Sequence, residues 1–259
     1  MNRPSLFDEF PQVSSKQWKQ KIQYDLKGAD YNEALVWESL EGIKVKPYYH
    51  SEDLENLKSF QHTEAYGWKI GQPIYVGNSS LANRKAIDSL ERGAESLVFT
   101  IPNEDIDFSA LLNGIDLETT QLHFNIQFLA VEPIKKLLAH VNGTNAKIFL
   151  NLDPIGHLGK TGNWYQNLEK DHQLLEEVYA MVSNFKNSSV LSVDLSHYQN
   201  SGATMVQQLA YGLAHANEYL HHFSNIPSTL SREAFPITFK VSVGSNYFFE
   251  ISKLRALRW

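Results

Sequence analysis

Cysteine is absent from this sequence of 259 residues. Its absence excludes disulfide bonds, thiolate zinc sites and cysteine nucleophiles. The chain also lacks any run of about 18 apolar residues and any apolar stretch behind its first residues, which membrane spans and secretion signals require. We therefore expect a cytoplasmic protein that does not enter a membrane.

Positive charge is scarce as well. The 23 Lys and Arg residues are outnumbered by 29 Asp and Glu, which leaves a formal net charge of -6. Nucleic acids and anionic membrane surfaces select proteins with a basic excess, so we expect neither as a partner. Apolar residues are plentiful at 42% of the chain, enough to build a substantial core.

The first 66 residues differ in pattern from the rest, and we predict an N-terminal arm over 1–66. Ser14 can cap a helix that Gly28 ends, and residues 40–42 can form the turn of a short hairpin. One helix and one hairpin bury little by themselves, so the arm should pack on the main body or on a partner. Its large apolar side chains are Leu6, Phe7, Phe10, Trp18, Tyr24, Tyr31 and Trp37.

Strand and helix patterns alternate from residue 72 onward. Strands are predicted at 73–77, 97–101, 122–128, 147–152, 190–195 and 237–243. Helices are predicted at 81–92, 105–113, 131–141, 167–185, 203–223 and 247–258. Such alternation indicates a parallel sheet with right-handed crossovers.

A doubly wound sheet and a (β/α)8 barrel both fit this alternation. No G-x-G-x-x-G follows the first strand, which weakens the doubly wound, dinucleotide-binding form. His123, Asn125 and Gln127 alternate along one strand face, and polar side chains there suit a barrel lumen. We predict a TIM-type α/β barrel over 67–259, incomplete at six βα units. Because the last helix pattern has no terminating signal, we expect the chain to be the front part of a longer architecture.

Two helices carry apolar stripes that should face the core. In 203–223 the stripe is Val206, Leu209, Leu213 and Leu220, and in 247–258 it is Ile251, Leu254 and Leu257. His215, His221 and His222 cluster on the first of these helices. No acidic second shell is evident for them, so we predict an exposed helix surface and no metal site.

The segment after strand 147–152 partly matches two ligand-binding motifs. Gly159-Lys160-Thr161 resembles a phosphate loop, but that motif needs glycine at position 154, which is Pro. Asp153 and His157 do not complete the D-x-H-x-x-G signature of cobalamin ligation, because position 155 is Ile and position 160 is Lys. The plainer interpretation is a loop, 153–156, at the carboxyl face of the sheet.

His197 is the candidate catalytic residue. It directly follows strand 190–195, where barrel enzymes place catalytic groups. An imidazole there could donate a hydrogen bond to a substrate carbonyl or act as an acid. The alternative is a loop histidine bonded to nearby backbone, and position alone does not decide between the two.

Three stretches resemble the methylmalonyl-CoA mutase family: IQYDLKGADYNEALVWESLEGIKVKPYY (22–49), SHYQNSGATMVQQLAYGLAHANEYL (196–220) and VSVGSNYFFEISKLRALRW (241–259). The resemblance implies a (β/α)8 barrel with the coenzyme A chain along its axis, followed by a cobalamin domain. It also implies an adenosylcobalamin-dependent holoenzyme that interconverts methylmalonyl-CoA and succinyl-CoA. In bacterial heterodimers of this family, a catalytic large subunit pairs with a shorter relative that does not catalyse.

The resemblance is to that small, non-catalytic subunit. Catalytic members carry small side chains along the strands, whereas His123, Asn125 and Gln127 would fill the tunnel here. The family's catalytic histidine position is retained as His197, but its neighbours differ. We therefore expect a structural subunit portion that binds no cofactor itself and whose arm contacts the large subunit.

Two alternatives remain. One is a catalytically competent, acyl-CoA-binding barrel that uses His197 for the substrate carbonyl. The other, suggested only by the strand–helix alternation, is an unrelated barrel enzyme acting on a phosphorylated metabolite.

Overall fold

A computed structural model describes residues 9–55, 67–183, 185, 187–224 and 236–258. The chain divides into two compact units, Met1–Tyr66 and Gly67–Trp259. Leu6 and Phe7 of the predicted arm lie outside the described residues. Among the described helices, none combines the length and apolar character that crossing a bilayer requires.

The first unit contains short elements. They are α1 (Ser15–Asp25), α2 (Tyr31–Leu35), the antiparallel pair β1 (Trp37–Glu38) and β2 (Lys44–Val45), and the 3-10 helix η1 (Ser51–Leu54). The predicted cap and turn are confirmed: Ser14 Oγ accepts from the Gln17 amide at 3.3 Å, and Gly42 takes φ +73° between the two strands. No residue of α1 is buried, and Trp18 packs edge-on against Tyr48 at 6.2 Å.

The second unit is a parallel sheet. Its strands are β3 (Gly71–Tyr75), β4 (Ser96–Ile101), β5 (Gln121–Ile126), β6 (Lys147–Leu152), β7 (Ser189–Asp194) and β8 (Ile237–Lys240). Among the described residues the sheet has six strands, all parallel and arranged in chain order. The six predicted strands are confirmed, with shifted ends: β3 lies two residues earlier than predicted, β5 ends at Ile126 rather than at residue 128, and β8 ends at Lys240 rather than at residue 243. A doubly wound sheet would require the strand order to reverse at one point, and among the described strands it does not.

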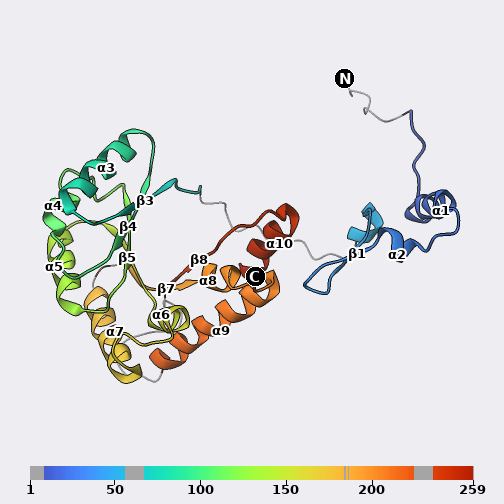
Figure 1. The fold of residues 1–259 in the computed structure, drawn as a ribbon. Coiled ribbons are helices and arrows are strands. Elements are labelled where there is room, and N and C mark those ends of the chain that lie inside the picture. Colours follow the sequence, from blue (N-terminus) through green and yellow to red (C-terminus); the bar gives the residue numbers. More distant parts are fainter. Residues whose placement is uncertain (1–8, 56–66, 184, 186, 225–235, 259) are drawn as a thin grey trace. The chain divides into compact units, whose positions relative to one another are not determined.

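Helices follow the strands. They are α3 (Ser79–Glu91), α4 (Phe108–Leu112), α5 (Val131–Val141), α7 (Leu168–Val182), α9 (Met205–Ser224) and α10 (Tyr247–Leu257). Figure 1 shows α3, α4, α5 and α7 along one side of the strands. Gly93 and Gly143 take positive φ angles just past α3 and α5, as predicted for residues that end helices.

The core lies between the sheet and these helices. Every second residue of β5 is buried, while the residues between them are only partly covered, so the two faces differ as the period-two pattern predicted. Phe99 and Phe124 are fully buried and stack at 5.7 Å between ring centres. Each large apolar side chain buried this way contributes about 1.5–3 kcal/mol.

The predicted core stripe of α9 is wrong for three of its four residues, and Leu209 alone of the four packs against the core. Val206, Leu213 and Leu220 are 41–53% exposed, while a different face of the helix, which includes Gly212 and Tyr219, is buried. Gly212 permits this orientation because a Cβ there would lie 2.7 Å from Leu195 Cγ. Polar contacts of Tyr219 and His215 with Asp153 determine the buried face instead of the apolar stripe.

The predicted stripe of α10 is also wrong. Ile251 and Leu254 are about 40% exposed, whereas Glu250 and Lys253 are buried. These two charges pair at 2.6 Å, and Lys253 Nζ also donates to Ser242 O at 2.8 Å. A buried charge requires such partners, so the ion pair determines which face turns inward.

Two helices occur where the sequence predicted loops: α6 (Pro154–Thr161) and α8 (Ser196–Asn200). The interpretation of 153–156 as a loop is therefore wrong. Asp153 Oδ1 accepts from the Gly156 amide at 2.8 Å, and Pro154 takes the first helical position, where its missing N–H has no helical partner to lose. Both helices begin directly after strands, at the carboxyl end of the sheet.

Candidate functional site

A pocket of about 780 Å³ opens at the carboxyl ends of the strands. Strands β4 to β8 and helices α6 and α8 all contribute to its lining. The pocket brings together the four residues singled out from the sequence, His123, Asn125, Gln127 and His197.

His123 and Asn125 of β5 contact the neighbouring strand β6, whereas Gln127 lies just past the end of β5. His123 stacks on Phe149 of β6, with ring centres 4.3 Å apart and planes within 8°. Burial lowers the pKa of His123, so the ring is neutral near pH 7. Asn125 Oδ1 accepts from Asn151 Nδ2 at 3.0 Å, and Gln127 is exposed. The contacts of His123 and Asn125 therefore join β5 to β6.

Asn151 owes its position to an irregularity in β6. Its φ is +46°, and the register between β6 and β7 shifts between Phe149 and Leu152. Asparagine tolerates this left-handed conformation better than most residues, and bulges of this kind recur beside binding sites. Asn151 was not predictable as a pocket residue, because an isolated Asn within an apolar strand carries no distinctive signal.

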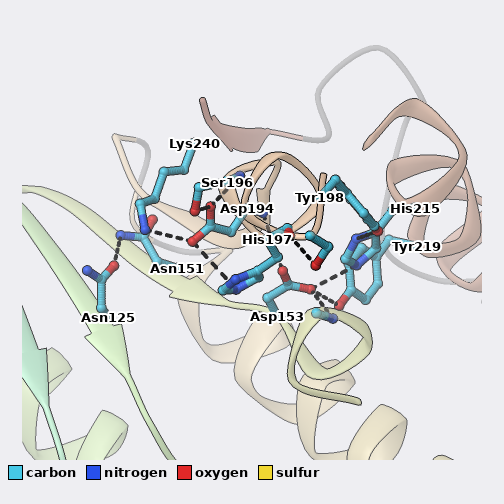
Figure 2. A network of polar contacts seen from close by, with 12 residues as sticks. Asn125, Asn151, Asp153, Asp194, Ser196, His197, Tyr198, His215, Tyr219 and Lys240 are labelled. Atoms are coloured by element: carbon cyan, nitrogen blue, oxygen red, sulfur yellow. Dashed lines mark hydrogen bonds and ion pairs between the residues drawn. The ribbon is translucent and has the colours of Figure 1, made fainter. Parts of the chain in front are cut away.

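Asp194 organises one wall of the pocket (Figure 2). Lys240 Nζ lies 2.6 Å from Asp194 Oδ2, and the Ser196 amide and hydroxyl both donate to Asp194 Oδ1. Burial raises the pKa of Asp194, but the hydrogen bonds from Lys240 and Ser196 outweigh it, and the net pKa is lowered. The carboxylate therefore remains ionised near neutral pH.

His197 lies beside this carboxylate, within α8 rather than in a loop. Its Nε2 is 3.6 Å from Asp194 Oδ2, and its side chain is 35% exposed. The carboxylate restrains the orientation of the imidazole ring through this contact. The arrangement could present His197 to a carbonyl or an anion in the pocket.

A second carboxylate, Asp153, joins the end of β6 to α9 (Figure 2). Tyr219 Oη donates to Asp153 Oδ1 at 2.8 Å, and Tyr219 Oη accepts from the Ile155 amide at 3.0 Å. Burial, followed by the nearby Asp153 charge, raises the pKa of Tyr219 well above its usual value. The phenol therefore stays protonated and acts as a donor to Asp153.

His215 extends this network, and its predicted exposure is wrong. The residue is only 5% exposed, with Nε2 2.9 Å from Asp153 Oδ1. This contact does not meet the geometry of a hydrogen bond. Tyr198 Oη lies 3.1 Å from His215 Nδ1 on the other side of the ring. Asp153, distant in sequence, is an acidic partner of His215 that no local pattern signals.

Helix α6 lines the pocket without forming a phosphate loop. The Thr161 hydroxyl donates to His157 O at 2.9 Å, so it is engaged within its own helix. His157 stacks on Tyr165 with ring centres 3.8 Å apart, and burial raises the pKa of Tyr165 to about 12. Among the described residues, no group of three or more His, Cys, Asp or Glu side chains has the geometry to hold a metal ion.

Fold and site together define a protein of repeated βα units, with a polar pocket where its parallel strands end. A family model described as methylmalonyl-CoA mutase matches residues 104–259. The chain is 32% identical to a methylmalonyl-CoA mutase small subunit of Porphyromonas gingivalis, across 99% of this chain and 44% of that protein. The chain therefore belongs to the methylmalonyl-CoA mutase family.

More distant relatives agree with this assignment. A methylmalonyl-CoA mutase small subunit of Streptomyces virginiae is 23% identical over 98% of this chain and 45% of that protein. The large subunit of the same organism is 24% identical over 96% of this chain and 40% of that protein. The chain spans less than half the length of these curated relatives.

Proposed function

We propose that this chain is the corresponding portion of a cytoplasmic methylmalonyl-CoA mutase small subunit. Its role is structural, and the isomerisation of methylmalonyl-CoA and succinyl-CoA takes place in the holoenzyme. The observation that carries the proposal is similarity to a small subunit along 99% of the chain.

The sheet belongs to a (β/α)8 barrel in this proposal. Six parallel strands in chain order, with helices along one side, support it. In an open arc the outer edges of β3 and β8 have no strand partner among the described residues. Exposed edges of this kind favour pairing with further strands, and closing the barrel removes them.

The pocket side chains fill the axis of that barrel. His123, Asn125 and Gln127 all line the pocket on the face that a closed barrel would enclose. His123 against Phe149 and Asn125 against Asn151 place bulky polar groups where a pantetheine chain would need space. This arrangement favours a structural role over substrate binding.

Adenosylcobalamin belongs to the holoenzyme in this proposal, and the described residues do not fit it. The ligand signature would need histidine at position 155, which is Ile with its amide bonded to Tyr219 Oη. His157 lies within α6 and is stacked on Tyr165. No step of the proposed function runs through the cofactor on this chain.

The first unit supplies the contact with the large subunit. Phe10, Trp18, Tyr24 and Trp37 are 48–80% exposed within this unit, whereas Tyr31 is buried. Aromatic anchors of this kind contribute about 2 kcal/mol or more each when an interface covers them. We therefore propose a heterodimer in which residues 1–66 lie against the partner.

Co-expression with the large subunit of the same organism tests these proposals. We expect the chain to co-purify with that subunit, and a variant lacking residues 1–30 to lose the association. His197→Ala should leave the mutase activity of the reconstituted enzyme unchanged. Unaltered association of the truncated chain would disprove the role of the arm, and loss of activity in His197→Ala would disprove the structural role.

The second candidate is an acyl-CoA-binding barrel that uses His197. The observation in its favour is the position of His197, which lines the pocket beside the ionised Asp194. Titration of the chain with succinyl-CoA distinguishes the two functions. Saturable binding that His197→Ala abolishes would establish the second candidate, and absence of binding would remove it.

A further inference from the structure

Two histidines from different helices lie in contact outside the pocket, with their rings tilted relative to each other. His172 of α7 and His222 of α9 have ring centres 4.5 Å apart, with planes inclined by 58°. Neither ring contributes to the pocket at the strand ends. The proposed subunit role does not use them.

Each ring is oriented by an acceptor oxygen that faces one of its nitrogens. His172 Nδ1 lies 2.7 Å from Leu168 O, and His222 Nε2 lies 2.7 Å from Glu176 Oε1. A carbonyl or carboxylate oxygen only accepts, so each facing nitrogen carries the proton. In the neutral ring the lone pair then belongs to the other nitrogen: Nε2 of His172 and Nδ1 of His222.

Metal-binding histidines show this same pattern. One nitrogen donates to a carbonyl or carboxylate, which orients the ring and raises the basicity of the ligating nitrogen. Two imidazoles on one tetrahedral ion, each about 2.1 Å away through a nitrogen, bring their ring centres to roughly 4.5–5.5 Å. The observed separation of the two rings falls within that range.

We propose that His172 and His222 bind one divalent transition-metal ion of the class that prefers imidazole, such as Zn²⁺, Ni²⁺ or Cu²⁺. Glu176 orients His222 and is not itself a ligand. The His222 side chain is 30% exposed, so water can complete the coordination. This replaces the expectation that the α9 histidines form a plain helix surface, because Glu176 is an acidic second shell that α7 supplies.

The metal links two helices of the outer layer in this proposal. The rival explanation is a simple brace, in which the His222–Glu176 pair fastens α9 to α7 without any ion. A brace predicts that substitutions change stability equally with and without metal. A metal site predicts that the stabilisation appears only when the ion is present.

Isothermal titration of the untagged 259-residue chain with Zn²⁺ tests the site. We expect saturable binding of one equivalent, weakened at least ~10-fold by His172→Ala and by His222→Ala. His221→Ala is the matched control, since His221 is exposed and adjacent on the same helix. Glu176→Gln should also weaken binding, by about 10-fold or more, with both ligands in place.

Thermal unfolding with and without Zn²⁺ provides the second measurement. Zn²⁺ should raise the unfolding temperature of the native chain and of the His221→Ala variant. It should leave the unfolding temperature of the His172→Ala variant unchanged. Should an alanine variant fail to fold, His172→Gln and His222→Gln replace it. Absence of saturable binding to the native chain, or equal loss in His221→Ala, would overturn the proposal.

Discussion

Tyr219 of α9 donates its hydroxyl to Asp153 Oδ1 at 2.8 Å, across 66 residues of sequence. This one contact joins an outer helix to the carboxyl end of β6. It also explains the orientation of α9, because a largely buried carboxylate must be satisfied, whereas an exposed Leu costs comparatively little. Asp153 therefore determines which face of α9 turns inward.

Removal of the Tyr219 hydroxyl should destabilise the fold. Tyr219→Phe leaves Asp153 short of a buried donor, and we expect a loss of about 1–3 kcal/mol in the free energy of unfolding. Urea titration followed by circular dichroism measures the effect. Tyr211→Phe, on the same helix but 48% exposed, is the control and should change stability by less than about 0.5 kcal/mol. Equal effects of the two substitutions would contradict this account of α9.

The close approach of α9 to the sheet predicts a second effect. A methyl group at position 212 would lie 2.7 Å from Leu195 Cγ, so Gly212→Ala should destabilise by about 1–3 kcal/mol. Gly159→Ala in α6 is the control, because nothing lies within 4 Å of its Cβ position. Alanine there should be neutral or stabilising by about 0.5–1 kcal/mol. Thermal unfolding of both variants measures the contrast, and a stable Gly212→Ala would show that α9 packs less closely.

Asp194 predicts a dependence of stability on pH. Its folded-state pKa lies below the ordinary value of 3.8, so the unfolded chain takes up the proton first as pH falls. The stabilisation is thus complete well above pH 3.8 and is lost as pH falls through the lowered value. Asp194→Asn should reduce stability at pH 7 and flatten the acid limb of the stability curve.

Urea titrations at several pH values between neutrality and pH 3 measure this curve. The exposed Asp88, which pairs with Arg92 on the helix surface, supplies the control variant Asp88→Asn. Its curve should match that of the native chain. A parallel downward shift of the Asp194→Asn curve at every pH would mean that the carboxylate does not titrate with folding.

The buried pair in α10 predicts asymmetric effects of substitution. Lys253→Met leaves Glu250 as an unpaired buried charge and should cost about 3–5 kcal/mol. Replacing both residues, as Glu250→Leu with Lys253→Met, should cost less than the single change, because no charge then remains buried. Equilibrium unfolding of the three chains completes the comparison. A double variant less stable than Lys253→Met would contradict this explanation.

Much of the secondary structure was predictable from the sequence. Ser14, Gly93 and Gly143 mark helix ends through chemistry contained within a few neighbouring residues, and the structure confirms them. Period-two patterns located the strands for the same reason, since alternation reports directly on a sheet with two unlike faces. The polar face of β5 was likewise visible, and its residues line the pocket.

Helix α6 was predictable in principle from Asp153 and Pro154, a cap followed by a first-position proline. Interpreted only as parts of ligand-binding motifs, these residues led to the prediction of a loop. By contrast, nothing local signals the bulge at Asn151, because the register of β6 depends on the strand that pairs with it.

Local sequence alone determined where the strands and most of the helices lie, and that they alternate in a parallel order. Only the tertiary structure decided which faces of α9 and α10 are buried. Contacts with Asp153 place Tyr219 and His215 on the buried face of α9 and leave most of its apolar stripe exposed. The ion pair of Glu250 and Lys253 is buried in the same way, so the stripe of α10 faces outward. The stabilising free energy of apolar burial is spread over many residues, whereas a buried charge without a partner costs several kcal/mol at one position. The polar partners come from distant segments, so only the folded chain brings them together.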